Sequence, residues 1–305
     1  MMDAELIRSA RALEGVDVLL NEPLSRHTSL GVGGPADLFV VPHSTDALCA
    51  VVNYAVEAQI PFFVLGEGTN VIVRDGGIRG MAVKLGQNLA VISRDGSLVT
   101  AQAGARLAML CRKCCEWGLS GLEFAAGIPG SIGGALVMNA GAYDGEVGHV
   151  VDWVLAIDGD GHKRRLSRDE LDMRYRHSTF QRNGMIIAEA GFLLRPDDPK
   201  AVRSRTYAVV EDRCCKQPVA QRSAGSIFRR PTGDYAGRLL DQAGAKGLEV
   251  GGAKISEKHA NFIVNCNAAT AAQILELIEL ARQRVHDQFD VWLESEVMVV
   301  GEDPQ

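Results

Sequence analysis

The stretch that most constrains the fold of this chain is residues 127–143, GIPGSIGGALVMNAGAY, with five glycines, one proline and no charged residue. Each interior glycine costs a helix about 1 kcal/mol relative to alanine, and proline removes a backbone donor, so a good helix is not expected here. Apolar residues such as Ile132 and Leu136 call for burial, which excludes a solvated linker. The stretch could be a tight packed turn, but we favour a loop that presents bare N–H groups to a phosphate.

A second glycine-rich loop lies upstream in residues 64–73, VLGEGTNVIV. An apolar strand enters Gly-Glu-Gly-Thr-Asn and a second strand leaves it. The glycines permit positive φ angles, while Thr69 and Asn70 offer hydrogen bonds to a ligand. Two such loops in one chain suggest a long cofactor with a pyrophosphate, and a dinucleotide fits better than a mononucleotide.

Composition narrows the class of protein. A chain of 305 residues predicts two or three domains, and a net charge of -6 argues against a nucleic-acid binder. The sequence has no run of eighteen apolar residues, so no membrane span is expected. Charged residues at Asp3, Glu5 and Arg8 are atypical of a secretory signal, and we therefore expect a cytoplasmic protein.

Two segments could be mistaken for metal sites. The chain has seven cysteines, and those at positions 111, 114 and 115 have helical spacing without a following zinc motif, so we interpret them as core or near-surface thiols. The turn at residues 158–161, Asp-Gly-Asp-Gly, lacks the twelfth-position glutamate of a calcium loop. It is more typical of a hairpin turn between strands 150–157 and 163–166, and no metal is expected.

The two loops resemble the FAD-binding loops of the UDP-N-acetylenolpyruvoylglucosamine reductase (MurB) family. Further similar segments follow in the family's order: Tyr-Arg-His-Ser at 175–178, the serine loop at 223–231 and the strand KHANFIVN at 258–265. The resemblance covers residues 22–301, and the absence of an added loop between Arg176 and Ser226 is similar to the type II branch. One departure is Arg230, where many members carry asparagine.

This resemblance implies an α+β fold: a two-subdomain FAD-binding fold of the vanillyl-alcohol-oxidase/PCMH type with an α+β substrate-binding domain. The expected ranges are 1–85 and 86–198 for the two FAD-binding subdomains and 199–305 for the substrate-binding domain, whose last strand can pack back on the FAD domain. The implied activity is NADPH-dependent reduction of UDP-N-acetylglucosamine enolpyruvate to UDP-N-acetylmuramate through non-covalent FAD, by a monomer without nucleic-acid or membrane partners.

The resemblance also assigns roles to residues that would otherwise be unremarkable. Arg176 could be a solvated turn residue, Ser226 a surface hydroxyl and Glu296 an outward strand residue. By resemblance, Ser226 donates the proton, and Arg176 with Glu296 stabilises developing negative charge. The implied FAD-binding residues are Gly66, Glu67, Gly68, Thr69, Asn70, Gly127, Ile128, Gly130, Ser131, Gly133, Gly134, Asn139, Ala140 and Gly141. The candidate substrate-binding residues are Tyr175, Lys216, Arg229, Lys246, His259 and Asn261.

Two other functions stay open from the sequence. An FAD-linked oxidase of the same flavin fold would pass electrons to oxygen, although it would often carry a tethering His or Cys in the cofactor loops. A non-catalytic nucleotide-sugar binder would not need Ser226 and Glu296 beside two pyrophosphate loops. A bound yellow chromophore would exclude the binder.

Overall fold

The computed structural model describes residues 3–304, which form two compact units. Unit 1 comprises residues 3–20, 37–67 and 80–212, and unit 2 comprises residues 21–36, 68–79 and 213–304. Neither unit is a continuous stretch of sequence. Residues 21–36 and 68–79 group with the C-terminal third, and each unit is described by itself below.

Unit 1 begins with helix α1 (Ala4–Arg11), and helix α2 (Thr45–Glu57) follows after a Ser44 cap whose hydroxyl accepts the Ala47 N–H. A four-stranded sheet has the order β1-β2-β5-β3. Its strands are β1 (Val16–Pro23), β2 (Pro35–Pro42), β5 (Ile78–Lys84) and β3 (Phe62–Leu65). β3 and β5 run parallel, so the loop after β3 starts beside the end of β5.

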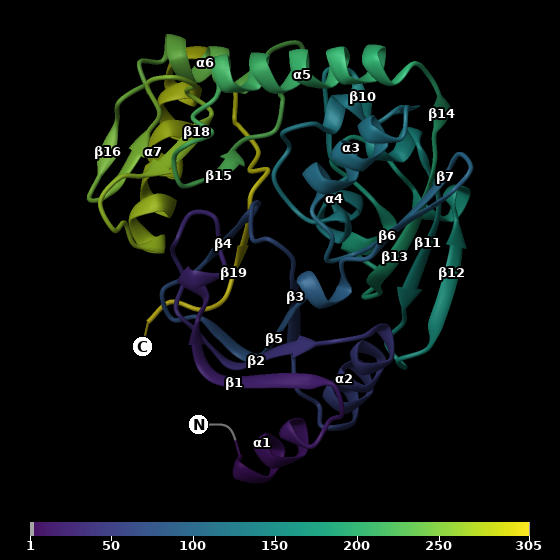
Figure 1. Ribbon diagram of the computed structural model, residues 1–305. Coiled ribbons are helices and arrows are strands. Elements are labelled where there is room, and N and C mark those ends of the chain that lie inside the picture. The colour runs from purple at the N-terminus through teal and green to yellow at the C-terminus, as the bar shows by residue number, and fades with distance from the viewer. Residues whose placement is uncertain (1–2, 305) are drawn as a thin grey trace. The chain divides into compact units, whose positions relative to one another are not determined.

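A second sheet in unit 1 has the order β12-β11-β13-β7-β6 and is antiparallel throughout. Its strands are β6 (Ile92–Asp95), β7 (Leu98–Gln102), β11 (Val151–Ile157), β12 (Lys163–Ser167) and β13 (Ile186–Leu193). Ile157 pairs with Lys163, which confirms the predicted hairpin. Helices α3 (Leu107–Glu116) and α4 (Ile132–Val137) lie beside this sheet (Figure 1).

Helix α4 is a difference from the sequence expectation, since it lies inside the glycine-rich stretch. It has only six residues, and Ser131 caps its first turn by accepting the Gly134 N–H at 3.3 Å. Gly133 allows the helix to approach Ala103, where an added Cβ would lie 3.1 Å from that side chain. The glycines therefore serve close packing as well as loop geometry.

The core of unit 1 includes the predicted core thiols. Cys111 and Cys114 are buried on α3, and burial raises the pKa of both, that of Cys111 to about 12. Both thiols therefore stay protonated at neutral pH, and the interpretation as core cysteines is confirmed. The last helix to begin in this unit, α5 (Pro199–Lys216), buries only Val202.

Unit 2 contains an antiparallel sheet of order β15-β18-β17-β16, with strands β15 (Ser223–Ser226), β18 (Phe262–Asn265), β17 (Ala253–Ile255) and β16 (Glu249–Val250). Helices α6 (Ala236–Gln242) and α7 (Ala271–Phe289) pack with it, and a Thr270–Gln273 capping box opens α7. The terminal strand β19 (Met298–Val300) pairs in parallel with β4 (Val71–Val73).

The remaining regular elements are short. Two-residue strands pair as β8 (Leu119–Ser120) with β14 (Arg195–Pro196) and β9 (Gly141–Ala142) with β10 (Gly145–Glu146). The 3-10 turns are Leu24–Arg26, Gln87–Leu89, Glu123–Ala125, Val147–His149, Arg168–Leu171 and Thr179–Gln181. Within residues 3–304, none of the helices combines the length and the hydropathy needed to cross a bilayer.

Candidate active site

The two predicted cofactor loops meet at Gly66 and Ser131 in unit 1. A Cβ added at Gly66 would overlap Ser131 Oγ, so only glycine permits this approach. The Ser131 loop is itself fastened by backbone hydrogen bonds, from Leu107 N–H to the Gly130 carbonyl at 3.0 Å and from Ile132 N–H to the Ala105 carbonyl at 2.8 Å. The structure thus brings together two loops that lie about sixty residues apart in the sequence.

This junction leaves backbone donors available. In the part of the chain that the structure describes, the N–H groups of Gly130 and Ser131 donate to no protein acceptor. Gly130 has a φ of 135°, a conformation that L side chains rarely adopt. Unpaired N–H groups beside a glycine are the donor set that a phosphate or pyrophosphate requires. The residues present therefore fit a pyrophosphate-containing cofactor.

Lys84 is a residue of this region that the sequence analysis missed. Its ammonium group, at the end of β5, donates to the Gly66 carbonyl and lies 4.0 Å from a Glu67 carboxylate oxygen. Glu67 is also held by Arg106, whose Nε lies 3.2 Å from the other oxygen. Burial lowers the pKa of Lys84, with Glu67 opposing the shift. The available signal in the sequence was a lysine inside the otherwise apolar run at residues 81–85.

Arg176 lies in a tight turn of unit 1 and is partly buried. The turn closes through two backbone hydrogen bonds between Arg174 and His177, at 3.1 and 2.9 Å. The Arg176 guanidinium donates to the Gly141 carbonyl at 3.2 Å and stacks over Tyr175 with 5.0 Å to the ring centroid. The candidate catalytic arginine and the end of the candidate cofactor loop therefore lie together.

Ser226 is the last residue of β15 in unit 2, and Glu296 lies on the segment that is hydrogen-bonded to the residues after it. The Glu296 N–H donates to the Ile227 carbonyl at 2.7 Å, and Arg229 N–H donates to the Glu294 carbonyl at 2.9 Å. Both Ser226 and Glu296 are partly buried. The Asn70 amide, from the first glycine loop, donates to the Glu296 carbonyl at 3.2 Å. A predicted cofactor-loop residue thus bonds to Glu296, and Glu296 bonds to the residue that follows Ser226.

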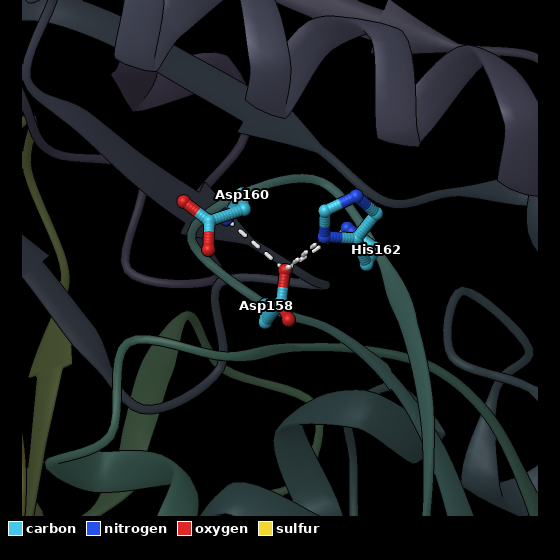
Figure 2. Close-up of side chains that lie close together, drawn as sticks. All are labelled: Asp158, Asp160 and His162. Carbon is cyan, nitrogen blue, oxygen red and sulfur yellow. Dashed lines mark hydrogen bonds and ion pairs between the residues drawn. The ribbon is translucent and has the colours of Figure 1, made fainter.

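The acidic turn at residues 158–162 is a turn cap (Figure 2). Asp158 accepts N–H bonds from Asp160 at 3.0 Å and His162 at 2.9 Å, and it pairs with Arg164 at 2.8 Å. These bonds occupy the Asp158 carboxylate, and the cluster is explained by the hairpin that it closes.

Comparison with known proteins identifies the family. Residues 217–300 match the UDP-N-acetylenolpyruvoylglucosamine reductase C-terminal domain, and residues 36–167 match an FAD binding domain. UDP-N-acetylenolpyruvoylglucosamine reductases of Syntrophomonas wolfei and Alkaliphilus oremlandii are 44% and 43% identical over 94% of this chain, covering 96% and 94% of their own lengths. The crystal structure of the Thermus caldophilus enzyme (MurB) is 34% identical with a TM-score of 0.81, covering 94% of this chain and 99% of that one.

The chain belongs to the UDP-N-acetylenolpyruvoylglucosamine reductase family. It is accordingly an FAD-dependent oxidoreductase with a two-domain α+β FAD-binding fold, which confirms the predicted family, fold class and cofactor. The Gly66–Ser131 junction lies inside the matched FAD domain, as does Lys84.

The remaining candidate substrate-binding residues of this family member lie in different surroundings. Lys216 and Tyr175 are exposed, and Lys246 pairs with Asp241 at 2.7 Å. The buried Nε of Arg229 has no hydrogen-bond partner within residues 3–304. Burial lowers the pKa of His259, which keeps its ring neutral at pH 7, and its Nδ1 accepts the Asn261 N–H at 3.2 Å. Asn261 itself is buried, and its amide is bonded to the Phe228 backbone.

Proposed function

We propose that this chain reduces UDP-N-acetylglucosamine enolpyruvate to UDP-N-acetylmuramate with NADPH as hydride donor, a step of peptidoglycan precursor synthesis. The observation that carries the proposal is the hydrogen bond from the Glu296 N–H to the carbonyl of Ile227, the residue that follows Ser226. A proton donor and a carboxylate on hydrogen-bonded segments suit a reaction that adds a proton to carbon while negative charge develops nearby. The net change is a hydride gained at C3 and a proton gained at C2, with NADPH oxidised to NADP⁺.

Each chain residue has a defined part in this proposal. Bound FAD would supply the hydride chemistry that amino-acid side chains lack. The loops around Gly66 and Ser131 would bind the pyrophosphate, together with the other cofactor residues named above. Arg176 would bind the substrate carboxylate and stabilise charge on it, with Glu296 as its partner or as a polarising acid. Ser226 Oγ would donate its proton to C2. The candidate substrate-binding residues would contact the nucleotide sugar.

We further propose that the enzyme works as a cytoplasmic monomer without a nucleic-acid partner, in line with its net charge of -6. The functional division into residues 1–85, 86–198 and 199–305 belongs to the same proposal. Cofactor binding would draw on the first two ranges and substrate binding on the third.

The test uses the visible absorbance of the FAD-loaded protein under anaerobic conditions. NADPH should bleach it, and UDP-N-acetylglucosamine enolpyruvate should restore it. Ser226→Ala should leave the bleaching unchanged and slow the recovery at least about 100-fold, because a positioned general acid contributes about 10²–10⁴-fold. Recovery with oxygen but never with the nucleotide sugar would establish an oxidase instead. A Ser226→Ala protein that recovers at the wild-type rate would refute the role of the serine.

A further inference from the structure

We infer that Asn139 and Gln181 are positioning residues that hold the Arg176 turn on the segment following the glycine-rich loop. The inference rests on the role proposed for Arg176 and adds how the orientation of that side chain is fixed. Neither residue needs to touch the substrate, since both act through the backbone of the turn.

The turn needs outside support because of its own conformation. Arg176 has a φ of 52°, in the left-handed region that a non-glycine residue occupies only when its surroundings require it. The Arg174 and His177 backbones close the turn by their mutual hydrogen bonds. The Arg174 carbonyl accepts the His177 N–H and has a second lone pair for another donor, while the Arg176 carbonyl lies outside this pair of bonds.

Two side-chain amides supply those donors. Asn139, fully buried, donates to the Arg174 carbonyl at 2.9 Å and accepts the Gly148 N–H at 2.9 Å. Gln181 donates to the Arg176 carbonyl at 3.0 Å and also to the Val137 carbonyl at 3.0 Å. Asn139, which follows α4, thus bonds directly to the turn. Gln181, which follows the turn, links the Arg176 carbonyl to the last residue of α4.

Two further bonds end on the same segment. Ser178, which is fully buried, donates to the Val137 carbonyl at 2.7 Å, and the Arg176 guanidinium donates to the Gly141 carbonyl. The backbone and the side chain of Arg176 are therefore both held to residues 137–141, the C-terminal part of the glycine-rich stretch 127–143. Loss of either amide should make the orientation of the Arg176 guanidinium less well defined, although the guanidinium itself is still present.

The experiment compares Gln181→Met, which keeps the length of the side chain but removes both donors, with Asn139→Asp, which keeps only the acceptor for Gly148. Asn183→Ala is the matched control, because this exposed amide lies on the same segment and bonds only to Thr179 and Met185. Three quantities are measured on each protein: the FAD dissociation constant, the rate of bleaching by NADPH and the rate of recovery with the enolpyruvyl nucleotide sugar.

We expect recovery to slow at least about tenfold in Gln181→Met and Asn139→Asp, since small misplacements of a catalytic group are costly. FAD affinity and bleaching in Gln181→Met, and all three quantities in the control, should stay within about twofold of wild type. In an Arg176→Ala background, Gln181→Met should cause no further loss, because two residues that act as one unit are not additive. If Asn139→Asp fails to hold FAD, the Gln181→Met result decides.

An additive loss in the Arg176→Ala background would overturn the inference, as would equal slowing by Asn183→Ala. The proposed function fails differently. In that case Arg176→Ala itself would leave recovery unchanged, or the nucleotide sugar would not restore the absorbance of the wild-type protein.

Discussion

At the residue scale, one buried side chain fixes the backbone next to Ser226. The Asn261 amide donates to the Phe228 carbonyl at 2.8 Å and accepts the Phe228 N–H at 2.9 Å, while the Asn261 carbonyl accepts the Ile227 N–H at 2.9 Å. These bonds satisfy the backbone of residues 227–228 on the side away from Glu296. Asn261 was predicted as a substrate contact, and the structure shows that its amide is occupied by Phe228.

Asn261→Ala should therefore affect both stability and chemistry. It leaves two buried backbone groups without partners, at a cost of about 1–3 kcal/mol in the free energy of unfolding. It should also slow recovery of the flavin absorbance, because the Ser226–Glu296 pair loses its support. Asn265→Ala is the control: it removes similar amide bonds, to the Leu30 carbonyl and the Ala269 N–H, further along the chain. Denaturation and stopped-flow absorbance measure the two effects, and equal slowing by Asn265→Ala would contradict the prediction.

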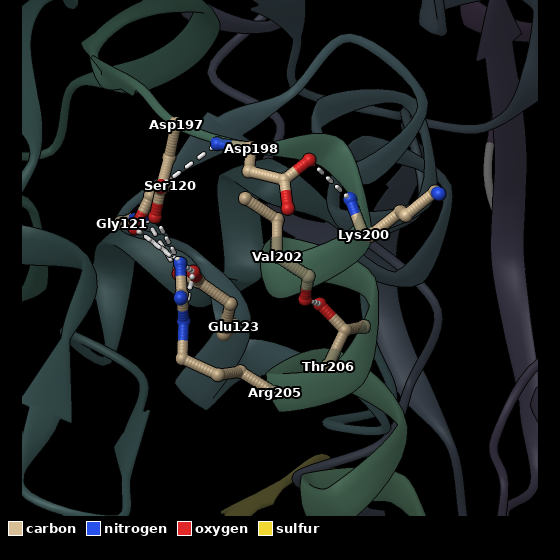
Figure 3. A network of polar contacts seen from close by, with 9 residues as sticks. All are labelled: Ser120, Gly121, Glu123, Asp197, Asp198, Lys200, Val202, Arg205 and Thr206. Atoms are coloured by element: carbon tan, nitrogen blue, oxygen red, sulfur yellow. Dashed lines mark hydrogen bonds and ion pairs between the residues drawn. The ribbon is translucent and has the colours of Figure 1, made fainter.

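At the scale of elements, a polar network fastens helix α5 to the chain that leads into the glycine-rich loop (Figure 3). Arg205 donates to Glu123 at 2.8 and 3.0 Å and pairs with Asp197 at 2.6 Å. Glu123 also accepts the Ser120 hydroxyl at 2.9 Å and the Gly121 N–H at 2.7 Å. Because α5 buries only Val202, this network is the main visible anchor of its first half.

The network predicts a pH-dependent contribution to stability. Burial alone would raise the pKa of Glu123, but the hydrogen bonds from Gly121, Arg205 and Ser120 outweigh burial and lower it. The stabilisation is therefore fully present above the unfolded-state pKa of about 4.3, and it is lost as pH falls through the folded-state value. Glu123→Gln should lower the free energy of unfolding by about 1–3 kcal/mol at pH 7, with a shrinking difference from wild type below pH 4.

Denaturant titrations of wild type and Glu123→Gln at several pH values measure this difference. Glu211→Gln, which removes an exposed carboxylate from the same helix, should change stability little at any pH. A Glu123→Gln difference that stayed constant from pH 7 to pH 3 would show that the charge of Glu123 contributes nothing.

The elements that could be predicted from the sequence are those with local signals. The hairpin turn at residues 158–161 and the core thiols at positions 111, 114 and 115 each have a signal within a few residues of chain, and the structure confirms them. Helix α4 was missed because its glycines are poor helix formers, and only contact with Ala103 and the Ser131 cap explain it. Lys84 was missed because its hydrogen-bond partner, the Gly66 carbonyl, directly follows a different strand, β3.

At the scale of the whole molecule, strands that are distant in the sequence pair in ways that no local sequence pattern predicts. β4 and β19 are parallel neighbours although the paired residues Val71 and Met298 are 227 positions apart in the sequence, and residues 68–79 belong to unit 2. The FAD binding domain match over residues 36–167 therefore includes residues of both units, with Gly66 in unit 1 and Gly68, Thr69 and Asn70 in unit 2.

The Gly66–Ser131 junction predicts that FAD stabilises unit 1. A ligand that binds only the folded state adds about 2.7 kcal/mol at a concentration 100 times its dissociation constant, equivalent to about 100-fold slower exchange through global unfolding. Hydrogen–deuterium exchange of the apoprotein and the FAD-loaded protein should therefore show protection in residues 127–134. Gly66→Ala should abolish this protection, because its Cβ would overlap Ser131 Oγ, whereas Gly159→Ala, with open space around the added Cβ, should preserve it. Equal exchange of residues 127–134 in the apoprotein and the FAD-loaded protein would contradict cofactor binding at this junction.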